Sequence, residues 1–308
     1  MAHTKRQSAR MLLAATMAMG LGTGTVHAAS LEDLLDATAL DRGYVAATPS
    51  EVERSEALFS RLLSGERGDA LAGAFRPLGF VLQQVTVGGE GLAVLSEAPE
   101  ARTGKGVYVV RGAGGALLPV ALQTPHRFKD VGTGRISVRI LAEDRRFAAA
   151  AWNTVPRWYD EPQGRVDADL AHARVSHFNA FTRAFARVHP GALIVQLHGF
   201  EADNRRTAAG GAADMVVSGT VSDPGPQVRL RADCLRGLGT WRVLLYPLET
   251  RELGGTTNKN ALALRSLSGN DGAEFLHLEI AREPRRRLLS DAALRRQLTA
   301  CLLGGQLR

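Results

Sequence analysis

The sequence predicts an α/β fold in which a mostly parallel sheet is flanked by helices. From about residue 117 onward, apolar runs of strand length alternate with longer stretches of helical periodicity, which is typical of βαβ units. The run 192–197 is almost entirely apolar, as expected of a strand covered on both faces. The composition, 45% hydrophobic and 22% charged over 308 residues, is that of a globular chain and excludes a disordered or fibrous one.

Residues 1–28 have the pattern of a cleavable secretory signal peptide. Basic residues precede the apolar run 11–20, which is too short for a permanent membrane anchor, and small residues lead to Ala29. We therefore expect a periplasmic or secreted protein with no integral membrane segment after removal of the signal peptide. Without its three basic residues the chain has 35 basic against 31 acidic residues, a formal charge of +4 instead of +7. The arginines are scattered among acids, which argues against nucleic-acid binding.

Residues 29–78 predict an N-terminal helical extension, with Ser30 capping a helix over 31–40 and a capping box that begins at Ser50. Residues 79–308 predict the catalytic domain. Its strand-like runs are 80–87, 91–95, 106–110, 117–122, 147–152, 192–197, 215–218, 242–246 and 274–280, and its helix-like runs are 136–141, 168–188 and 290–303.

The chain contains two cysteines, Cys234 and Cys301. In an oxidising compartment they are able to form one disulfide that ties the C-terminal helix to the rest of the domain. Two buried free thiols are the alternative. Neither cysteine has a partner at a metal-binding or redox spacing.

Two histidines follow or end strands of the predicted sheet. His126 comes just after the strand 117–122, and His198 ends the strand 192–197. Ligands of open α/β sheets gather at the carboxyl ends of strands, so we expect these side chains to meet. With Asp130 they supply three ligands, the number that a catalytic zinc uses while keeping one position for water, whose pKa falls towards ~7. In the alternative interpretation, His126 belongs to a proline-containing turn and Asp130 caps a helix.

Glu279 interrupts the apolar strand 274–280, on the face opposite Leu278 and Ile280. A buried carboxylate needs a partner, because an unpaired buried charge is costly. One partner is a metal-activated water, from which Glu279 takes a proton as general base. A salt bridge to Arg282 or Arg285 is the alternative.

The order of these residues resembles that of the zinc carboxypeptidase-like amidohydrolases. Pro125-His126, 197–200 and 278–282 are most similar to the N-formylglutamate amidohydrolase and poly-γ-glutamate hydrolase branch, over roughly residues 120–285. The resemblance implies a three-layer, phosphorylase/hydrolase-like α/β/α sandwich with a mixed, mostly parallel central sheet. It also implies Zn²⁺ bound by His126, Asp130 and His198, with Glu279 as catalytic carboxylate. Carboxypeptidases proper use His-x-x-Glu, whereas Lys129 stands at that position here, which favours the amidohydrolase branch.

The same resemblance implies that Asn153 and Arg157 bind the substrate. A guanidinium suits a carboxylate, and an amide is able to donate to a developing oxyanion. His172 follows Asp169 at the start of the predicted helix 168–188, where it either supports the site or accompanies an acid that stabilises the helix dipole. Asn258, in a glycine-rich loop, is a further candidate substrate contact.

The sequence thus predicts an exported zinc-dependent amidohydrolase or peptidase that cleaves an amide next to a carboxylate. A non-catalytic periplasmic binding or scaffold protein on the same fold is the alternative. The chain contains no serine-nucleophile elbow, phosphate-binding loop or dinucleotide fingerprint. The sequence does not choose among peptidoglycan peptides, γ-glutamyl chains and formylated amino acids, and it leaves the oligomeric state open.

Overall fold

The computed structural model describes residues 31–112, 114, 117–267 and 272–304. The predicted signal peptide and Ser30 lie outside these residues. Within them, no helix has the length and apolar character needed to cross a membrane.

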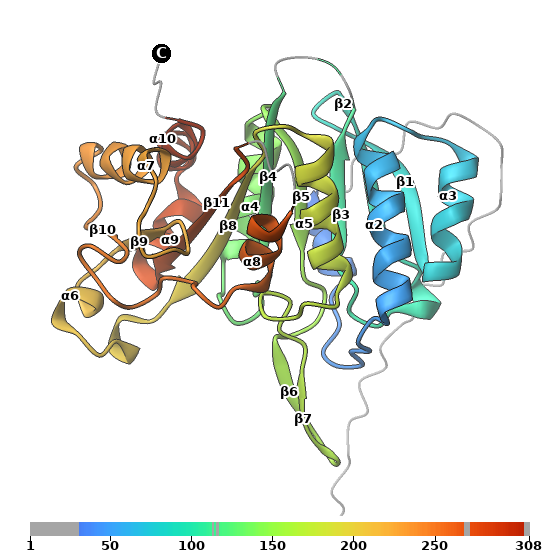
Figure 1. The fold of residues 1–308 in the computed structure, drawn as a ribbon, viewed down its shortest axis with the longest axis horizontal. Helices are drawn as coiled ribbons and strands as arrows, with labels where there is room; N and C mark the ends of the chain where they lie inside the picture. Colours follow the sequence, from blue (N-terminus) through green and yellow to red (C-terminus); the bar gives the residue numbers. More distant parts are fainter. Residues whose placement is uncertain (1–30, 113, 115–116, 268–271, 305–308) are drawn as a thin grey trace, which may run out of the picture.

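Nine strands form one central sheet (Figure 1). In spatial order they are β1 (Phe80–Val87), β2 (Glu90–Glu97), β3 (Val107–Arg111), β5 (Phe147–Trp152), β4 (Leu118–Thr124), β8 (Leu193–Phe200), β11 (Glu274–Ala281), β9 (Met215–Ser218) and β10 (Val243–Leu245).

The sheet is mixed, as predicted, but parallel pairing is not the majority. Among the described strands the block β5–β4–β8–β11 is parallel, as is β9–β10, whereas the pairings from β1 to β5 and that of β11 with β9 are antiparallel. The β1–β2 turn contains Gly88 and Gly89, both with positive φ, which allow a tight reversal and force antiparallel pairing.

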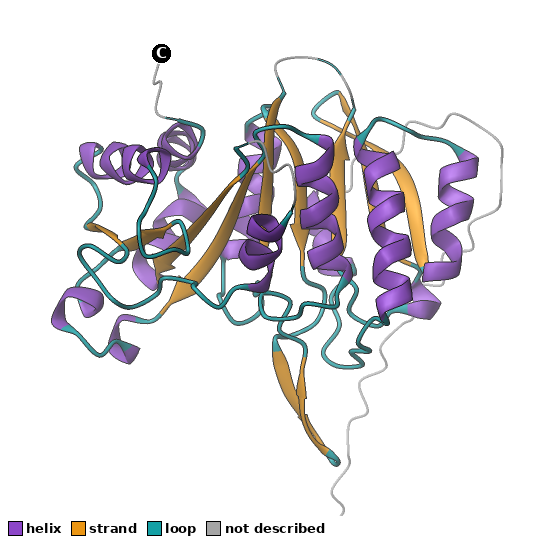
Figure 2. Ribbon diagram, viewed as in Figure 1, coloured by secondary structure: helices purple, strands orange, loops and turns teal. Residues whose placement is uncertain are grey.

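Helices cover both faces of the sheet, which confirms the three-layer arrangement (Figure 2). One layer consists of α2 (Pro49–Leu63), α3 (Asp69–Phe75), α5 (His177–Val188) and α8 (Lys259–Ser266). The other consists of α1 (Leu31–Ala37), α4 (Thr133–Glu143), α7 (Pro226–Gly237), α9 (Arg282–Ser290) and α10 (Ala292–Leu302). The remaining helical turns are α6 (Ala208–Gly211), η1 (Arg76–Leu78), η2 (Pro99–Ala101) and η3 (Ala202–Asn204). Each layer has its own apolar cluster with the sheet.

The predicted N-terminal extension packs on the same sheet. Phe59 of α2 meets Phe181 of α5 edge to face, with ring centroids 5.2 Å apart. The capping box of α2 is formed by Thr48 and Glu51, not by Ser50, because Pro49 already occupies the first helical position.

Two predicted helices differ from the structure. The stretch 168–188 is helical only from His177, because Ser176 caps α5 by accepting a hydrogen bond from Asn179 N. Before it lies a two-stranded hairpin absent from the prediction, β6 (Trp158–Glu161) and β7 (Gly164–Asp167). The stretch 290–303 is α10 alone, capped by Asp291, while Ser290 ends α9.

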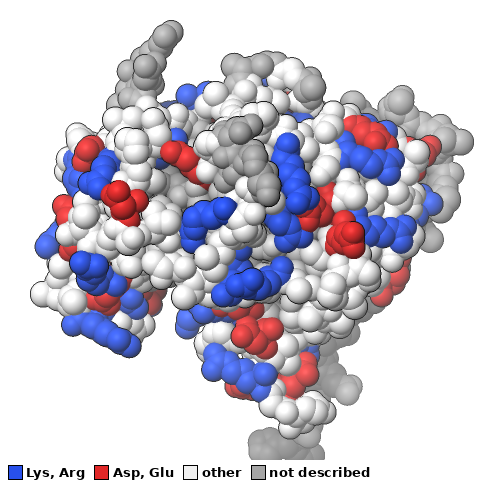
Figure 3. Space-filling model, viewed as in Figure 1, with Lys and Arg blue, Asp and Glu red and all other residues white. Residues whose placement is uncertain are grey.

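Cys234 of α7 and Cys301 of α10 form a disulfide, so the interpretation as free thiols is wrong. The bond joins the C-terminal helix to the helix that follows β9, as predicted. Basic and acidic side chains intermingle on the face shown in Figure 3, with no continuous basic stripe among the described residues.

Candidate metal centre

The carboxyl ends of two neighbouring central strands bring the three predicted metal ligands together. His126 and Asp130 lie in the turn between β4 and α4, where Asp130 N donates to His126 O at 2.8 Å. His198 lies in β8, which pairs with β4. All three are buried, and one ligand atom from each lies within 4.8 Å of the other two. His126 does lie in the proline-containing turn of the alternative interpretation, but Asp130 does not cap α4, whose N-cap is Gly132.

Hydrogen bonds fix which nitrogen of each ring is available to a metal. His126 Nε2 lies 2.7 Å from Asp169 Oδ1, and His198 Nε2 lies 2.8 Å from Gln196 Oε1. Both partners are acceptors, so each neutral ring carries its hydrogen on Nε2 and a lone pair on Nδ1.

Both Nδ1 atoms face the carboxylate of Asp130. The distance to Asp130 Oδ2 is 3.6 Å from His126 Nδ1 and 3.4 Å from His198 Nδ1. Three acceptor atoms that converge in a buried place repel one another unless a cation lies between them. Two imidazole nitrogens and one carboxylate oxygen are a three-ligand set that suits zinc, and the outer hydrogen bonds hold the rings in the ligating orientation. The residues present therefore fit a divalent metal.

The protonation of the ligands follows from the same contacts. Burial lowers the pKa of His198 to about 4, so this ring is neutral at pH 7, as a ligand must be. Burial opposes the protonation of His126, but the carboxylates of Asp130 and Asp169 outweigh it and raise the pKa of His126. Burial also disfavours the charge of Asp130, yet the nearby rings of His126 and His198 hold its pKa far below the usual range.

A row of buried amides supports His198. Gln196 Oε1 accepts from His198 and from Asn258 Nδ2, and Gln196 Nε2 donates to Gln123 Oε1 at 3.0 Å. Gln123 Nε2 in turn donates to Thr182 Oγ1 at 2.9 Å. These donors orient the Gln196 amide, which fixes the ring of His198. The sequence signal was available, because each glutamine interrupts an apolar strand.

Asp169 is a site residue that the sequence motifs did not reveal. Its Oδ1 accepts from His126 Nε2, and its Oδ2 lies 2.9 Å from His172 Nδ1 and 2.7 Å from Arg157 Nε. Burial opposes the charge of Asp169, but hydrogen bonds from His126 and His172 keep its pKa well below normal. Asp169 and His172 lie in a turn ahead of α5, so the alternative in which they open a helix is wrong.

Glu279 lies beside the ligands on β11, in register with His198 on the adjacent parallel strand. Its Oε1 is 3.2 Å from His277 Nε2, and its buried Oε2 has no hydrogen-bond partner among the described residues. The alternative interpretation, a salt bridge from Glu279 to Arg282 or Arg285, is wrong, because both arginines bind Glu201, at 2.6 and 2.9 Å. His277, which the sequence did not single out as a site residue, lines the same cavity.

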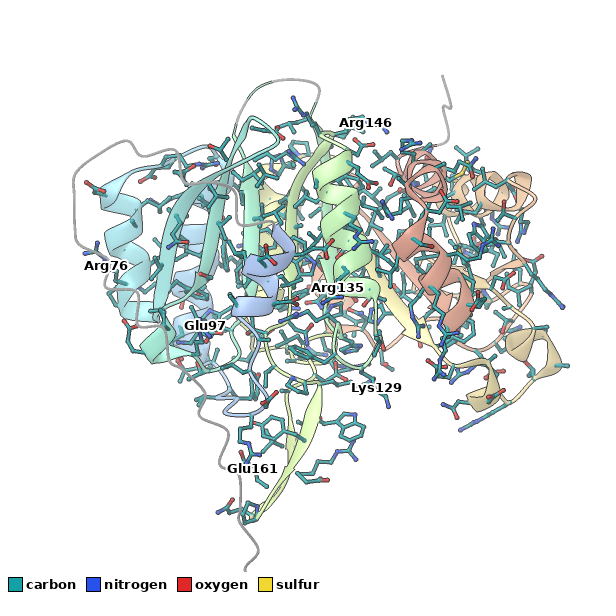
Figure 4. All side chains as sticks on the ribbon, turned by 180° about the vertical axis from the view of Figure 1, so that it is seen from behind. Arg76, Glu97, Lys129, Arg135, Arg146 and Glu161 are labelled. Carbon is teal, nitrogen blue, oxygen red and sulfur yellow. A yellow bond between two sulfur atoms is a disulfide. The ribbon has the colours of Figure 1, made fainter. Side chains whose placement is uncertain are left out.

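A cavity of about 650 Å³ opens over this centre. Glu279, Arg157, His172 and Asn258 line it together with the three ligands. Its other basic residues are Lys129, Arg205, Arg282, Arg285 and Arg286, and its apolar residues include Val131, Phe200, Leu253 and Leu289. Figure 4 shows Lys129 near the base of the β6–β7 hairpin, where its Nζ lies 5.4 Å from the centre of the Trp158 ring.

Asn153 does not reach this cavity. Its side chain is fully buried, Oδ1 accepts from Arg127 N at 2.9 Å, and Nδ2 donates to Val155 O at 2.7 Å. Because Asn153 is fully buried, does not line the cavity and bonds within its own surroundings through both ends of its amide, it holds the loop after β5 in shape and does not present its amide to a substrate. The predicted oxyanion role is therefore not supported by the geometry.

The chain matches no known family model and no curated protein. Three solved structures are similar to this chain. One is an N-formylglutamate amidohydrolase from Ralstonia eutropha (15% identity, covering 61% of this chain and 93% of that one, TM-score 0.39). The others are a bacteriophage poly-gamma-glutamate hydrolase (14% identity, 61% and 80%, TM-score 0.32) and an aspartoacylase family protein from Mesorhizobium loti (14% identity, 74% and 72%, TM-score 0.39). The first two are the kinds of enzyme that the sequence motifs resemble. At these identities and TM-scores the likenesses do not bear on activity, and the functional argument rests on the centre itself.

Proposed function

We propose that this protein is a zinc-dependent hydrolase that cleaves an amide bond next to a carboxylate. The observation that carries the proposal is the meeting of three acceptor atoms, from His126, Asp130 and His198, beside a carboxylate oxygen of Glu279 that has no partner among the described residues. A divalent cation between the three acceptor atoms and a water molecule at Glu279 Oε2 would satisfy these groups.

Bound at these ligands, Zn²⁺ supplies Lewis acidity towards a carbonyl oxygen and lowers the pKa of water. Glu279 performs the proton transfers of the proposed reaction. Its Oε2 takes a proton from the water that attacks the amide carbon and delivers it to the leaving nitrogen. The carbon–nitrogen bond breaks, and a carboxylic acid and an amine are released.

Arg157 supplies the recognition of the substrate carboxylate in this proposal. Its side chain is 36% exposed and lines the cavity, while Nε makes an ion pair with Asp169 that orients the guanidinium. Two parallel hydrogen bonds from a guanidinium suit a carboxylate, whereas the amine of a lysine would act only as a point charge.

Export to the periplasm or the medium is part of the proposal. The N-terminal pattern of residues 1–28 supports it, as does the disulfide between Cys234 and Cys301, since such bonds persist in oxidising compartments.

Metal analysis and kinetics of three variants test the proposal. We expect about one zinc per chain in the wild type and in Glu279→Gln, with turnover lost in Glu279→Gln. We expect His126→Ala and His198→Ala to lose zinc. The substrates are N-acyl amino acids and short peptides, each compared with its C-terminal amide, which we expect to be hydrolysed more slowly because it lacks the carboxylate.

Two results would overturn this function. A protein that takes up no zinc on dialysis lacks the proposed centre. A zinc-loaded protein that binds the carboxylate ligands but hydrolyses none of them is a non-catalytic binding protein.

A further inference from the structure

We propose that His277 positions the Glu279 carboxylate, holding Oε1 so that Oε2 is the oxygen that accepts the proton. The proposal rests on the proposed function, because it assigns the proton transfer to Glu279 and the orientation of the Glu279 carboxylate to His277. His277 is thus a positioning residue that acts through Glu279.

The two side chains project from the same face of β11, since residues two apart on a strand share a face. His277 Nε2 lies 3.2 Å from Glu279 Oε1. Each partner also has a buried atom with no hydrogen-bond partner among the described residues, namely His277 Nδ1 and Glu279 Oε2. The single contact therefore joins His277 Nε2 to Glu279 Oε1 and leaves His277 Nδ1 and Glu279 Oε2 without a hydrogen bond.

The direction of this hydrogen bond follows from the surroundings of the ring. His277 Nδ1 lies against Gly255, so closely that a β-carbon at Gly255 would come within 2.8 Å of it. A hydrogen on Nδ1 would be a buried donor without an acceptor, and Nε2 would then present a lone pair to a carboxylate. The tautomer with its hydrogen on Nε2 avoids both costs. His277 therefore donates to Glu279 Oε1.

The ring is held on two sides, so it is able to orient its partner. The imidazole of His198 stacks on it with centroids 4.3 Å apart, and Gly255 packs against its edge with a φ of +59°. Gly254, next in the same loop, is fixed by a hydrogen bond from Ser218 Oγ to its carbonyl at 2.8 Å. A side chain confined in this way loses little further freedom on forming its hydrogen bond.

The hydrogen bond is tested without any turnover by nitrogen NMR of ¹⁵N-histidine-labelled, zinc-loaded full-length protein. We expect the His277 ring to carry its hydrogen on Nε2, and we expect its signals to shift in Glu279→Ala. Assignment comes from the signals that vanish in His277→Gln. A hydrogen found on Nδ1, or signals unchanged by Glu279→Ala, would overturn the proposal.

Kinetics test the positioning role. His277→Leu removes the donor, and we expect kcat to fall roughly 10- to 100-fold with KM within about twofold, as for other residues that orient a catalytic group. His277→Gln places an amide donor near the position of Nε2, and we expect it to recover most of the loss. His189→Gln, a histidine that packs on Phe185 in the loop after α5, is the matched control with wild-type kinetics expected.

The outcomes separate this proposal from the proposed function. Equal kcat in His277→Leu and wild type, or equal loss in His277→Leu and His277→Gln at unchanged zinc content, refutes positioning while the hydrolase remains. A wild type that hydrolyses no substrate refutes the hydrolase and the catalytic role of the pair together, and the ring spectra still decide whether the hydrogen bond exists.

Discussion

His126 and Arg157 share one acceptor, because Asp169 binds His126 Nε2 through Oδ1 and Arg157 Nε through Oδ2, each at 2.7 Å. One carboxylate thereby connects a metal ligand with the arginine assigned to the substrate. Whatever alters Asp169 is expected to change metal binding and substrate binding together.

Asp169→Asn tests this connection. The amide keeps the shape of the side chain but loses the negative charge that holds His126 and Arg157. We expect zinc affinity to fall about 10-fold or more, as for other residues that support metal ligands, and KM for carboxylate substrates to rise. Titration calorimetry and kinetics measure the two effects. Asp160→Asn, an exposed acid on β6, is the control, and unchanged zinc affinity in Asp169→Asn would contradict the prediction.

Metal removal is expected to destabilise the protein. The ligands converge only in the folded chain, so binding to the native state adds stability, about 4 kcal/mol when free zinc is about 1,000 times its Kd. Calorimetry with a chelator should therefore show a Tm several degrees below that of the zinc-loaded protein. Mg²⁺ should not restore it, because nitrogen ligands disfavour that ion. Identical Tm values with zinc and with chelator would refute metal binding at this place.

The disulfide is expected to stabilise the fold without influencing the site. Its cysteines are 67 residues apart, and closing a loop of that length lowers the entropy of the unfolded chain by an amount worth about 4 kcal/mol. We expect Cys234→Ala with Cys301→Ala to lose stability of this order in urea unfolding. Zinc affinity should stay the same, because neither cysteine lines the cavity over the candidate metal centre.

Stability should fall as the pH is lowered below about 6.5, in part because of His177. Burial, and then the charge of Lys105, lower the pKa of His177 to about 4. The unfolded chain, with a normal histidine pKa near 6.5, binds a proton between these values and the folded chain does not, so acid favours unfolding. The loss from this residue reaches roughly 3 kcal/mol by pH 4. His177→Asn keeps a donor towards Ser55 and should flatten the profile, and parallel profiles would show that His177 contributes nothing.

The centre of the fold and the meeting of the candidate metal ligands were predictable from the sequence. Strands such as β5 and β9 are apolar runs bounded by turns, and the chemistry of His126, His198 and Glu279 stands out because each polar residue follows or interrupts such a run. The parallel block of the sheet then places these three side chains at one edge without any knowledge of the loops.

The features that the sequence did not predict depend on contacts between segments that lie far apart in the chain. The β6–β7 hairpin has few apolar residues, and it is tied down by Tyr159, whose hydroxyl accepts from Gly43 N and Tyr44 N over a separation of more than 100 residues. Asn153 directly follows β5, where a substrate-binding amide was expected, but its Oδ1 accepts from Arg127 N and its Nδ2 donates to Val155 O in the same loop. No local pattern reveals which polar side chain will find its partner within the protein.

In the proposed function, the register of β8 and β11 fixes the spacing of the reacting groups, and other segments supply the selectivity for substrate. His198 and Glu279 stand opposite each other on adjacent strands, so backbone hydrogen bonds of the sheet set the spacing between the proposed metal ligand and the proposed base. Arg157, Arg205 and Asn258 reach the cavity from segments outside the sheet. Selectivity is therefore expected to be open to redesign at Arg205, which pairs with Glu252. Changes at Arg157 or Asn258 would also disturb Asp169 and Gln196, which hold the rings of His126 and His198.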